Sequence, residues 1–265
     1  MLTDQTHFAF NIWDFESARA VMDAAASLRQ DVILQTSTSI YKELPAGMFS
    51  GFVKAYAKSA GINVWLNLDH CSEKETLFHA VDHGWDMVMA DASALSIKDN
   101  ILFTNEIAEY VHEKGGIVEA EVGQVKGFED DIAVRQEAIA MKEDIHFFLD
   151  SADVDFVAVA FGNAHGEYKG VPTLHYDLVE YTTGITDIPF VVHGGSGLSD
   201  EVLKRLIAIK GVRKLNISTD LKLAYQAGLR KALEDWNQPI IAARTVRNEI
   251  FKVAVSKMQL VKGEW

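Results

Sequence analysis

Three histidines stand where short apolar runs end, and their side chains are of a type that binds metal ions. They are His70, His165 and His193. Imidazole is a common zinc ligand, and a catalytic zinc site combines three protein ligands with an open position for water or substrate. A zinc ion held in this way acts as a Lewis acid on a substrate oxygen. If the three apolar runs are neighbouring strands, their ends therefore predict a zinc-dependent active site.

The segments that must position these histidines form a repeated pattern of apolar runs and helix-like segments. The apolar runs are continuous rather than alternating, which indicates strands buried on both faces, as in a parallel sheet. Eight such units in 265 residues favour a single-domain (β/α)8 TIM barrel spanning residues 1–265, because a doubly wound sheet usually stops at about five or six strands. From about residue 236 we expect a C-terminal helical extension. The eight expected strands are residues 8–12, 32–35, 64–69, 87–91, 117–121, 156–161, 190–193 and 214–218.

Two local features concern the helix expected after the third strand. Ser72 and Glu75 have the spacing of a capping box, which predicts a helix that begins there and continues through Val81. His79 and His83 have the i, i+4 spacing of a helical metal pair. They lie opposite the apolar face of this helix, so we assign them to a solvated face rather than to a metal site.

The composition restricts the class of protein. The single cysteine, Cys71, excludes an intramolecular disulfide framework, and three histidines with substrate oxygens leave it no place as a zinc ligand. The first residues lack the basic and apolar regions of a signal peptide, so we expect a cytoplasmic protein. A formal net charge of −13 opposes binding to nucleic acid or anionic lipid, and no apolar stretch reaches the roughly 20 residues of a membrane span. We therefore expect a small-molecule substrate, which local groups must attract if it is anionic.

In a (β/α)8 barrel the active site lies at the carboxyl ends of the strands. The polar residues at those ends are metal ligands, acid or base groups, or hydrogen-bonding groups. Any one of them alone is more often a loop cap or a satisfied core residue, since Asp and Asn commonly begin loops. Convergence of the whole set on one rim indicates a site. The candidates are Asn11, Ser37, Asp69, His70, Asp91, Glu121, His165, His193 and Asn216.

Two loops near these strand ends favour binding of a phosphate group. Residues 194–197 read Gly-Gly-Ser-Gly after the seventh expected strand, and residues 216–220 read Asn-Ile-Ser-Thr-Asp after the eighth. Glycine-rich turns expose backbone N–H groups, and the helix that follows adds the positive end of its dipole. The loops after strands seven and eight are also the usual phosphate site of this fold. Together they predict how a net-acidic protein holds a phosphorylated substrate.

Six segments, in order along the chain, resemble the motifs of class II zinc-dependent ketose-bisphosphate aldolases. This family includes fructose-bisphosphate and tagatose-bisphosphate aldolases, which the shared motifs do not separate. The resemblance extends from about residue 9 to about residue 223. The segments are NLDH at 67–70, MVMADAS at 87–93, VEAEVG at 118–123, GNAHG at 162–166, HGGSG at 193–197 and NIST at 216–219.

The resemblance implies two sets of metal ligands. The catalytic zinc would be bound by His70, His165 and His193. Asp91 and Glu121 would belong to an alternative, more buried metal position, which a second divalent or a monovalent cation would use.

The resemblance also implies which groups move protons and hold the substrate. Asp69 would take the proton of the substrate C4 hydroxyl, and Glu129, on a loop expected to be mobile, would move the proton on the dihydroxyacetone phosphate carbon. Asp69 is adjacent to His70, and strand alternation would point the two to opposite faces, so we expect a local bend that brings both into one site. The residues implied in holding dihydroxyacetone phosphate are Ser37, Gly166, Gly194, Gly195, Ser196, Asn216, Ile217, Ser218 and Thr219.

The implied activity is reversible retro-aldol cleavage of a ketose 1,6-bisphosphate, of the fructose or tagatose type, to dihydroxyacetone phosphate and an aldehyde such as glyceraldehyde 3-phosphate. This would place the chain in carbohydrate metabolism such as glycolysis, as a homodimer or homotetramer. Cleavage produces an enediolate, whose charge a divalent cation stabilises, so no Schiff-base lysine is required. The alternatives are an aldolase for another ketose 1-phosphate, a metal-dependent epimerase or isomerase, and a non-catalytic partner subunit. Three converging imidazoles argue against the last.

Three features depart from the family pattern. Lys126 stands before Gly127, where the family often has a second glycine. Ser218 stands where one subclass of fructose-bisphosphate enzymes has an acidic residue, which favours the tagatose-like subclass or a less common ketose phosphate. The stretch from residue 236, with Arg244 and Arg247, does not match the usual ending, so the motifs assign no cation to a distal phosphate.

Overall fold

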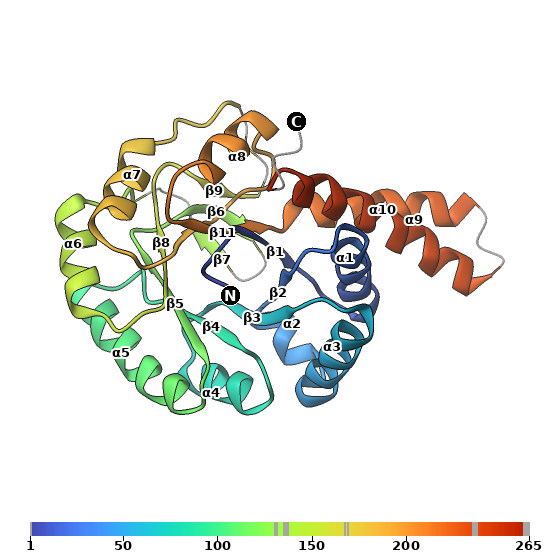
Figure 1. The fold of residues 1–265 in the computed structure, drawn as a ribbon, viewed down its shortest axis with the longest axis horizontal. Coiled ribbons are helices and arrows are strands. Elements are labelled where there is room, and N and C mark those ends of the chain that lie inside the picture. The colour runs from blue at the N-terminus through green and yellow to red at the C-terminus, as the bar shows by residue number, and fades with distance from the viewer. Residues whose placement is uncertain are drawn as a thin grey trace.

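Eight parallel strands close into a barrel, and helices surround it (Figure 1). The computed structural model describes residues 2–129, 132–134, 138–166, 168, 170–234 and 238–261, with the backbone alone at 128, 129 and 132–134. Around the barrel the strands follow the order β1-β11-β10-β8-β5-β4-β3-β2. All eight runs expected from the sequence form strands, which confirms the (β/α)8 fold class. Their bounds are β1 (His7–Asn11), β2 (Val32–Ser37), β3 (Val64–Cys71), β4 (Met87–Ala90), β5 (Ile117–Val122), β8 (Phe156–Val159), β10 (Phe190–Val192) and β11 (Val212–Ile217).

The helices cover the outside of the barrel, and the first shows why they begin where they do. Asp14 accepts a hydrogen bond from the Ser17 backbone N–H at 2.7 Å, and the Ser17 hydroxyl accepts one from the Asp14 N–H at 3.0 Å. This reciprocal cap satisfies donors that the first turn leaves without intrahelical partners. The helices are α1 (Phe15–Leu28), α2 (Thr38–Glu43), α3 (Ala46–Ala60), α4 (Lys74–Asp82), α5 (Ile97–Glu113), α6 (Lys142–Ser151), α7 (Tyr176–Ile185), α8 (Asp200–Ile207), α9 (Thr219–Glu234) and α10 (Pro239–Gln259).

The capping box expected at Ser72 and Glu75 is wrong. Strand β3 continues as far as Cys71, so Ser72 lies in the connection and α4 begins two residues later, after Glu73. The Glu73 carboxylate instead accepts from the Thr76 hydroxyl at 2.8 Å and forms an ion pair with a lysine of α2. Sequence spacing alone did not locate the end of the strand, and that end sets the start of the helix.

His79 and His83 lie on the exposed side of α4, as expected from the helical pattern. Their rings stack with centroids 3.9 Å apart, and His79 Nδ1 is hydrogen-bonded to the Tyr41 hydroxyl at 2.5 Å. Neither belongs to a group of converging metal-ligand atoms in the described chain. Their exposure agrees with the assignment to a solvated face.

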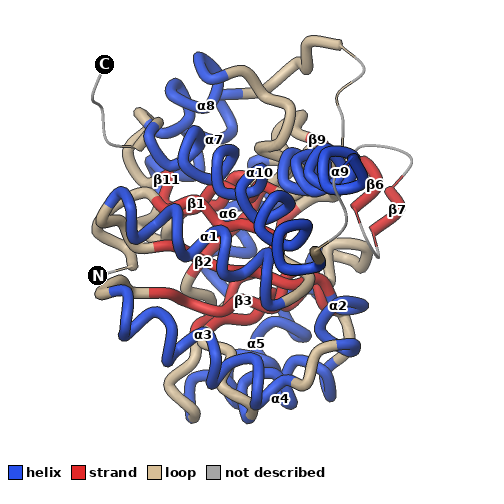
Figure 2. Tube along the Cα trace, turned by 90° about the vertical axis from the view of Figure 1, so that its right-hand side faces the viewer, coloured by secondary structure: helices blue, strands red, loops and turns tan. Residues whose placement is uncertain are grey.

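The connection that follows β5 supplies two strands of a small second sheet beside the barrel (Figure 2). Strands β6 (Lys126–Glu129) and β7 (Ile132–Val134) form an antiparallel hairpin, and β6 pairs in parallel with β9 (Ala164–His165). Gly127 is opposite His165 and has φ = +125°. A Cβ at Gly127 would lie 2.2 Å from the His165 carbonyl oxygen, so this close approach requires glycine.

Inside the barrel, the layer nearer the amino ends of the strands is apolar, and the layer nearer their carboxyl ends is polar. Ala9, Ile33, Met87, Phe156 and Val191 are buried together inside the barrel. Because side chains alternate along each strand, the positions two residues further on also face inward. Two of these positions, Gln35 and His193, are polar and fully buried, as are Asn67, Glu119 and Lys214 on other strands of the barrel. A larger apolar cluster fills the layer between the strands and the surrounding helices.

Helices α9 and α10 pack along each other and project from one side of the barrel (Figure 1). Helix α10 lies in the stretch that the sequence predicts to be a helical extension. Among the described residues, no helix is both long and apolar enough to cross a membrane.

Candidate metal centre and surrounding site

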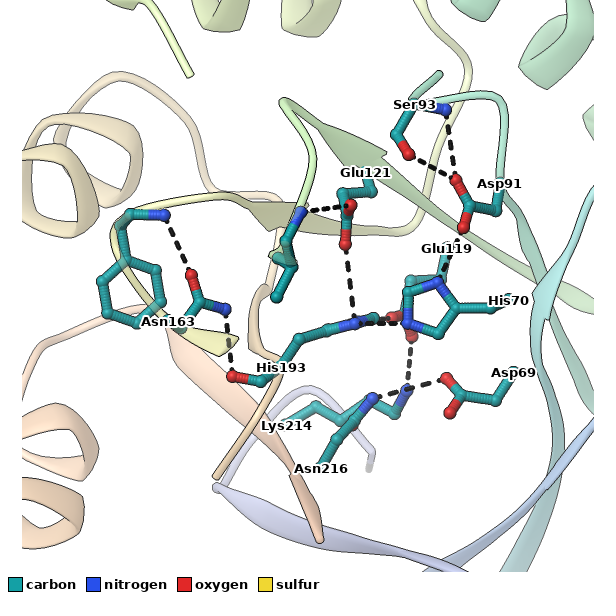
Figure 3. A network of polar contacts seen from close by, with 12 residues as sticks. Asp69, His70, Asp91, Ser93, Glu119, Glu121, Asn163, His193, Lys214 and Asn216 are labelled. Atoms are coloured by element: carbon teal, nitrogen blue, oxygen red, sulfur yellow. Dashed lines mark hydrogen bonds and ion pairs between the residues drawn. The ribbon is translucent and has the colours of Figure 1, made fainter. Parts of the chain in front are cut away.

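The end of β3 carries a bend that brings Asp69 and His70 into the same site. Pairing with β4 joins Leu68 to Val88 and then Cys71 to Ala90, so β3 has one more residue than its partner over this interval. At the bend His70 has φ = +46°, in the left-handed region, which costs a non-glycine residue about 1–2 kcal/mol. This bulge confirms the bend expected from the sequence, and Figure 3 shows the two side chains close to one another.

The three histidines converge. His70 comes from β3, His165 from β9, and His193 follows directly on β10. One ligand nitrogen from each lies within 4.8 Å of the others. His70 Nε2 and His193 Nδ1 are 2.8 Å apart.

In the His70 and His193 rings, the nitrogen that faces away from the other ring is hydrogen-bonded to a carboxylate (Figure 3). We call it the outer nitrogen, and the nitrogen that faces the other ring the inner nitrogen. His70 Nδ1 lies 2.7 Å from Asp91, and His193 Nε2 lies 2.9 Å from Glu119. Because a carboxylate accepts hydrogen bonds, both outer nitrogens are assigned as N–H donors. The inner nitrogens are hydrogen-bonded to each other, so they share one proton, and a bound cation would replace that proton on their lone pairs. Such an arrangement suits a cation between them, and carboxylates bound to ligating histidines are typical of metal sites. The donor set of three imidazoles fits zinc.

The acidic residues around the histidines have strongly shifted pKa values. Burial, together with the charge of Asp91, raises the pKa of Glu121 to about 8. Burial would also raise the pKa of Asp91, but the hydrogen bond and charge of His70 hold it below its usual range. Burial opposes protonation of His70, yet the charges of Asp69, Asp91 and Glu121 raise its pKa to about 10. The site thus concentrates negative charge that a bound cation would neutralise.

Of the two acids that the family resemblance assigns to a second metal position, Asp91 contacts His70 and Glu121 lies near His193. Asp91 also accepts from the backbone and hydroxyl of Ser93. Glu121 accepts from the Val125 N–H at 3.3 Å, and its other oxygen is 3.6 Å from His193 Nδ1. A further group of converging ligand atoms in the described chain consists of Asp69, Glu119 and His193.

Asp69 is held by three side-chain amides. One of its oxygens accepts from Asn11 at 3.1 Å and from Gln35 at 2.9 Å, and the other accepts from Asn216 at 3.4 Å. The carboxylate is 3% exposed. These contacts fix its orientation at the mouth of the barrel beside His70.

The two predicted phosphate loops are in contact. The Ser196 hydroxyl accepts from the backbone N–H groups of Ser218 at 3.0 Å and Asp220 at 3.3 Å, and so joins the loop after β10 to the start of α9. Gly194 has φ = +65°, and a Cβ there would lie 2.1 Å from a carbonyl oxygen of β9. Ser218 Oγ and Asn216 Oδ1 are buried without a hydrogen-bond partner among the described residues. A ligand at this rim would meet polar groups that the protein leaves unsatisfied.

The remaining members of the predicted cradle contribute differently. Gly166 has φ = +86° in the turn after β9, and Thr219 begins α9. The Ile217 side chain packs in the apolar layer, so its contribution is confined to the backbone. Ser37 caps α2, where its hydroxyl accepts from the Ile40 N–H at 3.5 Å.

The predicted loop acid, Glu129, lies at the end of β6. Its backbone pairs with Ile132 across the hairpin, whereas its side chain lies outside the described residues, as do Asp130 and Asp131. Through the pairing of β6 with β9, the hairpin that carries Glu129 is joined to the strand of the ligand candidate His165.

Three buried polar residues of the site were missed by the sequence analysis. Gln35 binds Asp69, while Glu119 binds both His193 and Lys214. Each lies on a predicted strand, two residues before a position that was recognised at the strand end. Period-two alternation places such residues inside the barrel, so this signal could have found them.

The comparison with protein families identifies the chain. Residues 5–264 match the family described as fructose-bisphosphate aldolase class II. The chain belongs to the class II fructose-bisphosphate aldolase family. The match spans both the motifs and the projecting α9–α10 pair, and membership supports a lyase.

Relatives of this aldolase family member cover nearly its full length. It is 31% identical to the sulfofructosephosphate aldolase of Alkalicoccus urumqiensis, over 86% of this chain and 79% of the relative. It is 33% identical to YdjI of Escherichia coli K12, over 96% of this chain and 92% of the relative. The crystal structure of the YdjI aldolase superposes with a TM-score of 0.84 at 28% identity and covers 97% and 91% of the two chains. A fructose-bisphosphate aldolase from Campylobacter jejuni, at 21% identity and TM-score 0.82 over 97% and 90%, shares the fold.

Proposed function

We propose that this class II aldolase family member catalyses the metal-dependent, reversible retro-aldol cleavage of a ketose 1-phosphate to dihydroxyacetone phosphate and an aldehyde. The 1,6-bisphosphates of fructose and tagatose are the first candidate substrates. The observation that carries the proposal is the convergence of His70, His165 and His193 within 4.8 Å, beside the oriented carboxylate of Asp69. When bound there, zinc would stabilise negative charge on the substrate carbonyl oxygen as a Lewis acid.

Asp69 is suited to proton transfer at the substrate C4 hydroxyl. A general base must have a fixed position within hydrogen-bond reach of the proton it removes. Three amides fix the carboxylate of Asp69, and its neighbour His70 would hold the metal to which the substrate binds. The amides of Asn11 and Gln35 then act as positioning groups for this base.

The phosphate end of the substrate fits the rim formed by the loops after β10 and β11. Helix α9, which begins at Thr219, presents the positive end of its dipole there, and glycine turns allow close approach of the backbone. These groups supply local positive potential in a chain with a formal net charge of −13. The unsatisfied Ser218 Oγ offers an additional donor.

The distal end of the substrate is less constrained. Arg247 forms an ion pair with Glu16 at 2.6 Å, and Arg244 is exposed on α10, so neither is committed to a ligand at the rim. One relative is named for a ketose phosphate that carries a sulfo group. The distal group is therefore the variable that an assay should scan.

A panel of ketose phosphates tests the proposed function. We would supply fructose 1,6-bisphosphate, tagatose 1,6-bisphosphate, fructose 1-phosphate and a 1-phosphate with a distal sulfonate, and measure dihydroxyacetone phosphate release with and without chelator. We expect chelator-sensitive release, with the distal group changing kcat/KM. A zinc-loaded protein that releases no product from any 1-phosphate contradicts the proposal.

Replacement of Glu129 tests the proposed loop acid. Glu129→Ala should slow exchange of the carbon-bound proton of dihydroxyacetone phosphate by about 10²- to 10⁴-fold, the effect of losing a positioned proton-transfer group, while substrate binding changes less. Asp130→Ala is the matched control, because it removes the same charge from the next position. Equal exchange rates in both variants and the parent would assign Glu129 to surface charge.

A further inference from the structure

A lysine is buried inside the barrel below the histidines. Lys214, on β11, is fully buried, and its Nζ lies 2.6 Å from one oxygen of Glu119, which is fully buried as well. The other oxygen of Glu119 lies 2.9 Å from His193 Nε2. Figure 3 shows the three residues as a continuous chain that ends at the His70–His193 pair.

A role in stability alone accounts poorly for this ion pair. Removing both charges from water costs several kcal/mol per ion, and apolar residues of similar volume often replace such pairs without loss of stability. The apolar layer inside the barrel, nearer the amino ends of the strands, shows that this interior accommodates apolar side chains. The position of the pair next to a ligand histidine offers a functional reason for it.

The contacts of Glu119 indicate how it acts on the metal centre. Although Glu119, Asp69 and His193 have ligand atoms within 4.8 Å of one another, both oxygens of Glu119 already accept from N–H donors. A charge-assisted hydrogen bond is short and orienting. The ammonium of Lys214 therefore fixes the carboxylate, and the carboxylate fixes the His193 ring.

We propose that Lys214 is a positioning residue for the metal: it holds Glu119 against His193 Nε2, so that His193 Nδ1 is presented to the ion. This inference rests on the metal centre of the proposed function. Loss of a group that orients a ligand typically lowers metal affinity by about 10- to 100-fold. Lys214 should thus control zinc affinity without contacting zinc.

A double-mutant cycle on the full chain tests the proposal. Zinc affinity is measured for the parent, K214M, E119Q and E119Q/K214M by competition with a chromophoric chelator, and thermal unfolding of each zinc-free protein is measured in parallel. K214M should weaken zinc binding by about 10- to 100-fold, with no further loss when it is added to E119Q, because Lys214 acts through Glu119. Stability should behave differently: the double variant should be more stable than either single variant, each of which leaves one charge buried alone.

The outcomes separate positioning from a structural role. Parental zinc affinity in K214M, or an equal additional loss in the E119Q background, overturns the proposal. If K214M does not fold, the double variant decides: weakened zinc binding in the folded protein supports positioning, and parental affinity overturns it. R247M is the control, since Arg247 is a largely buried cation that pairs between α10 and α1, and its zinc affinity should remain parental. A parent that binds no zinc refutes the metal centre itself, and this inference with it.

Discussion

Removal of bound metal is expected to abolish aldol cleavage, and added zinc is expected to restore it. His70, His165 and His193 converge on one point, and the outer nitrogens of His70 and His193 are already held by carboxylates. The residues around them would bind and orient a substrate but would leave the charge that develops on its carbonyl oxygen without stabilisation. The measurement is the cleavage rate as a function of zinc content, determined by elemental analysis after dialysis against a chelator.

The same preparation distinguishes metal-dependent cleavage from cleavage through a Schiff base. Within the described chain, Lys214 is the buried lysine, and its amine is engaged by Glu119 below the histidines rather than exposed at the rim. We expect borohydride with substrate to trap no covalent adduct, as read by intact mass. Activity retained by a metal-verified apo protein, or a trapped adduct, would contradict the metal-dependent mechanism.

The barrel could be predicted from the sequence because its strands are buried on both faces. Runs such as residues 156–161 and 190–193 are continuously apolar and punctuated by helical segments, and this pattern has few solutions other than a parallel barrel. Helix starts were harder to predict. Ser72 and Glu75 have the correct types and spacing for a cap, but β3 continues through a bulge to Cys71, and tertiary pairing overrides the local signal.

The site could be predicted where a residue ends a strand, and it was missed where a residue lies deeper. His70, His165 and His193 were recognised because a polar side chain after an apolar run is conspicuous. Glu119 and Lys214 lie inside such runs, and their mutual contact spans 95 positions of the sequence. A charged side chain inside a buried apolar run is unfavourable on its own. Only the folded barrel shows that Glu119 and Lys214 compensate each other's charge.

The β6–β7 hairpin was also missed as structure, although the importance of its segment was recognised. The stretch after β5 reads as a long loop with Gly127 and clustered acids. Its pairing with β9 depends on a close approach of Gly127 to His165. No periodic pattern in the sequence indicates this approach. The pairing joins the hairpin that carries Glu129 to the strand of the ligand candidate His165, so the position of the hairpin and the geometry of the proposed metal centre are physically connected.

Asp69→Ala is expected to lower the cleavage rate by about 10²- to 10⁴-fold, the range for loss of a positioned proton-transfer group, while zinc content stays near that of the parent. The carboxylate is buried and oriented by Asn11, Gln35 and Asn216, and its removal would take away the acceptor proposed for the C4 hydroxyl proton. The measurements are steady-state cleavage rates and bound zinc per chain, taken on the same preparation.

Bound zinc makes this experiment decisive, because the structure offers Asp69 a second role. Its ligand atoms lie within 4.8 Å of those of Glu119 and His193, so a metal-binding Asp69 would lose zinc together with activity on substitution. Gln35→Ala provides the matched control: it removes one supporting amide but keeps the carboxylate, and should reduce the rate less than Asp69→Ala does. Unchanged turnover with metal bound would mean that another group takes the proton. Loss of zinc in proportion to loss of rate would instead assign Asp69 to the metal, since a proton-transfer group leaves the ion in place when it is removed.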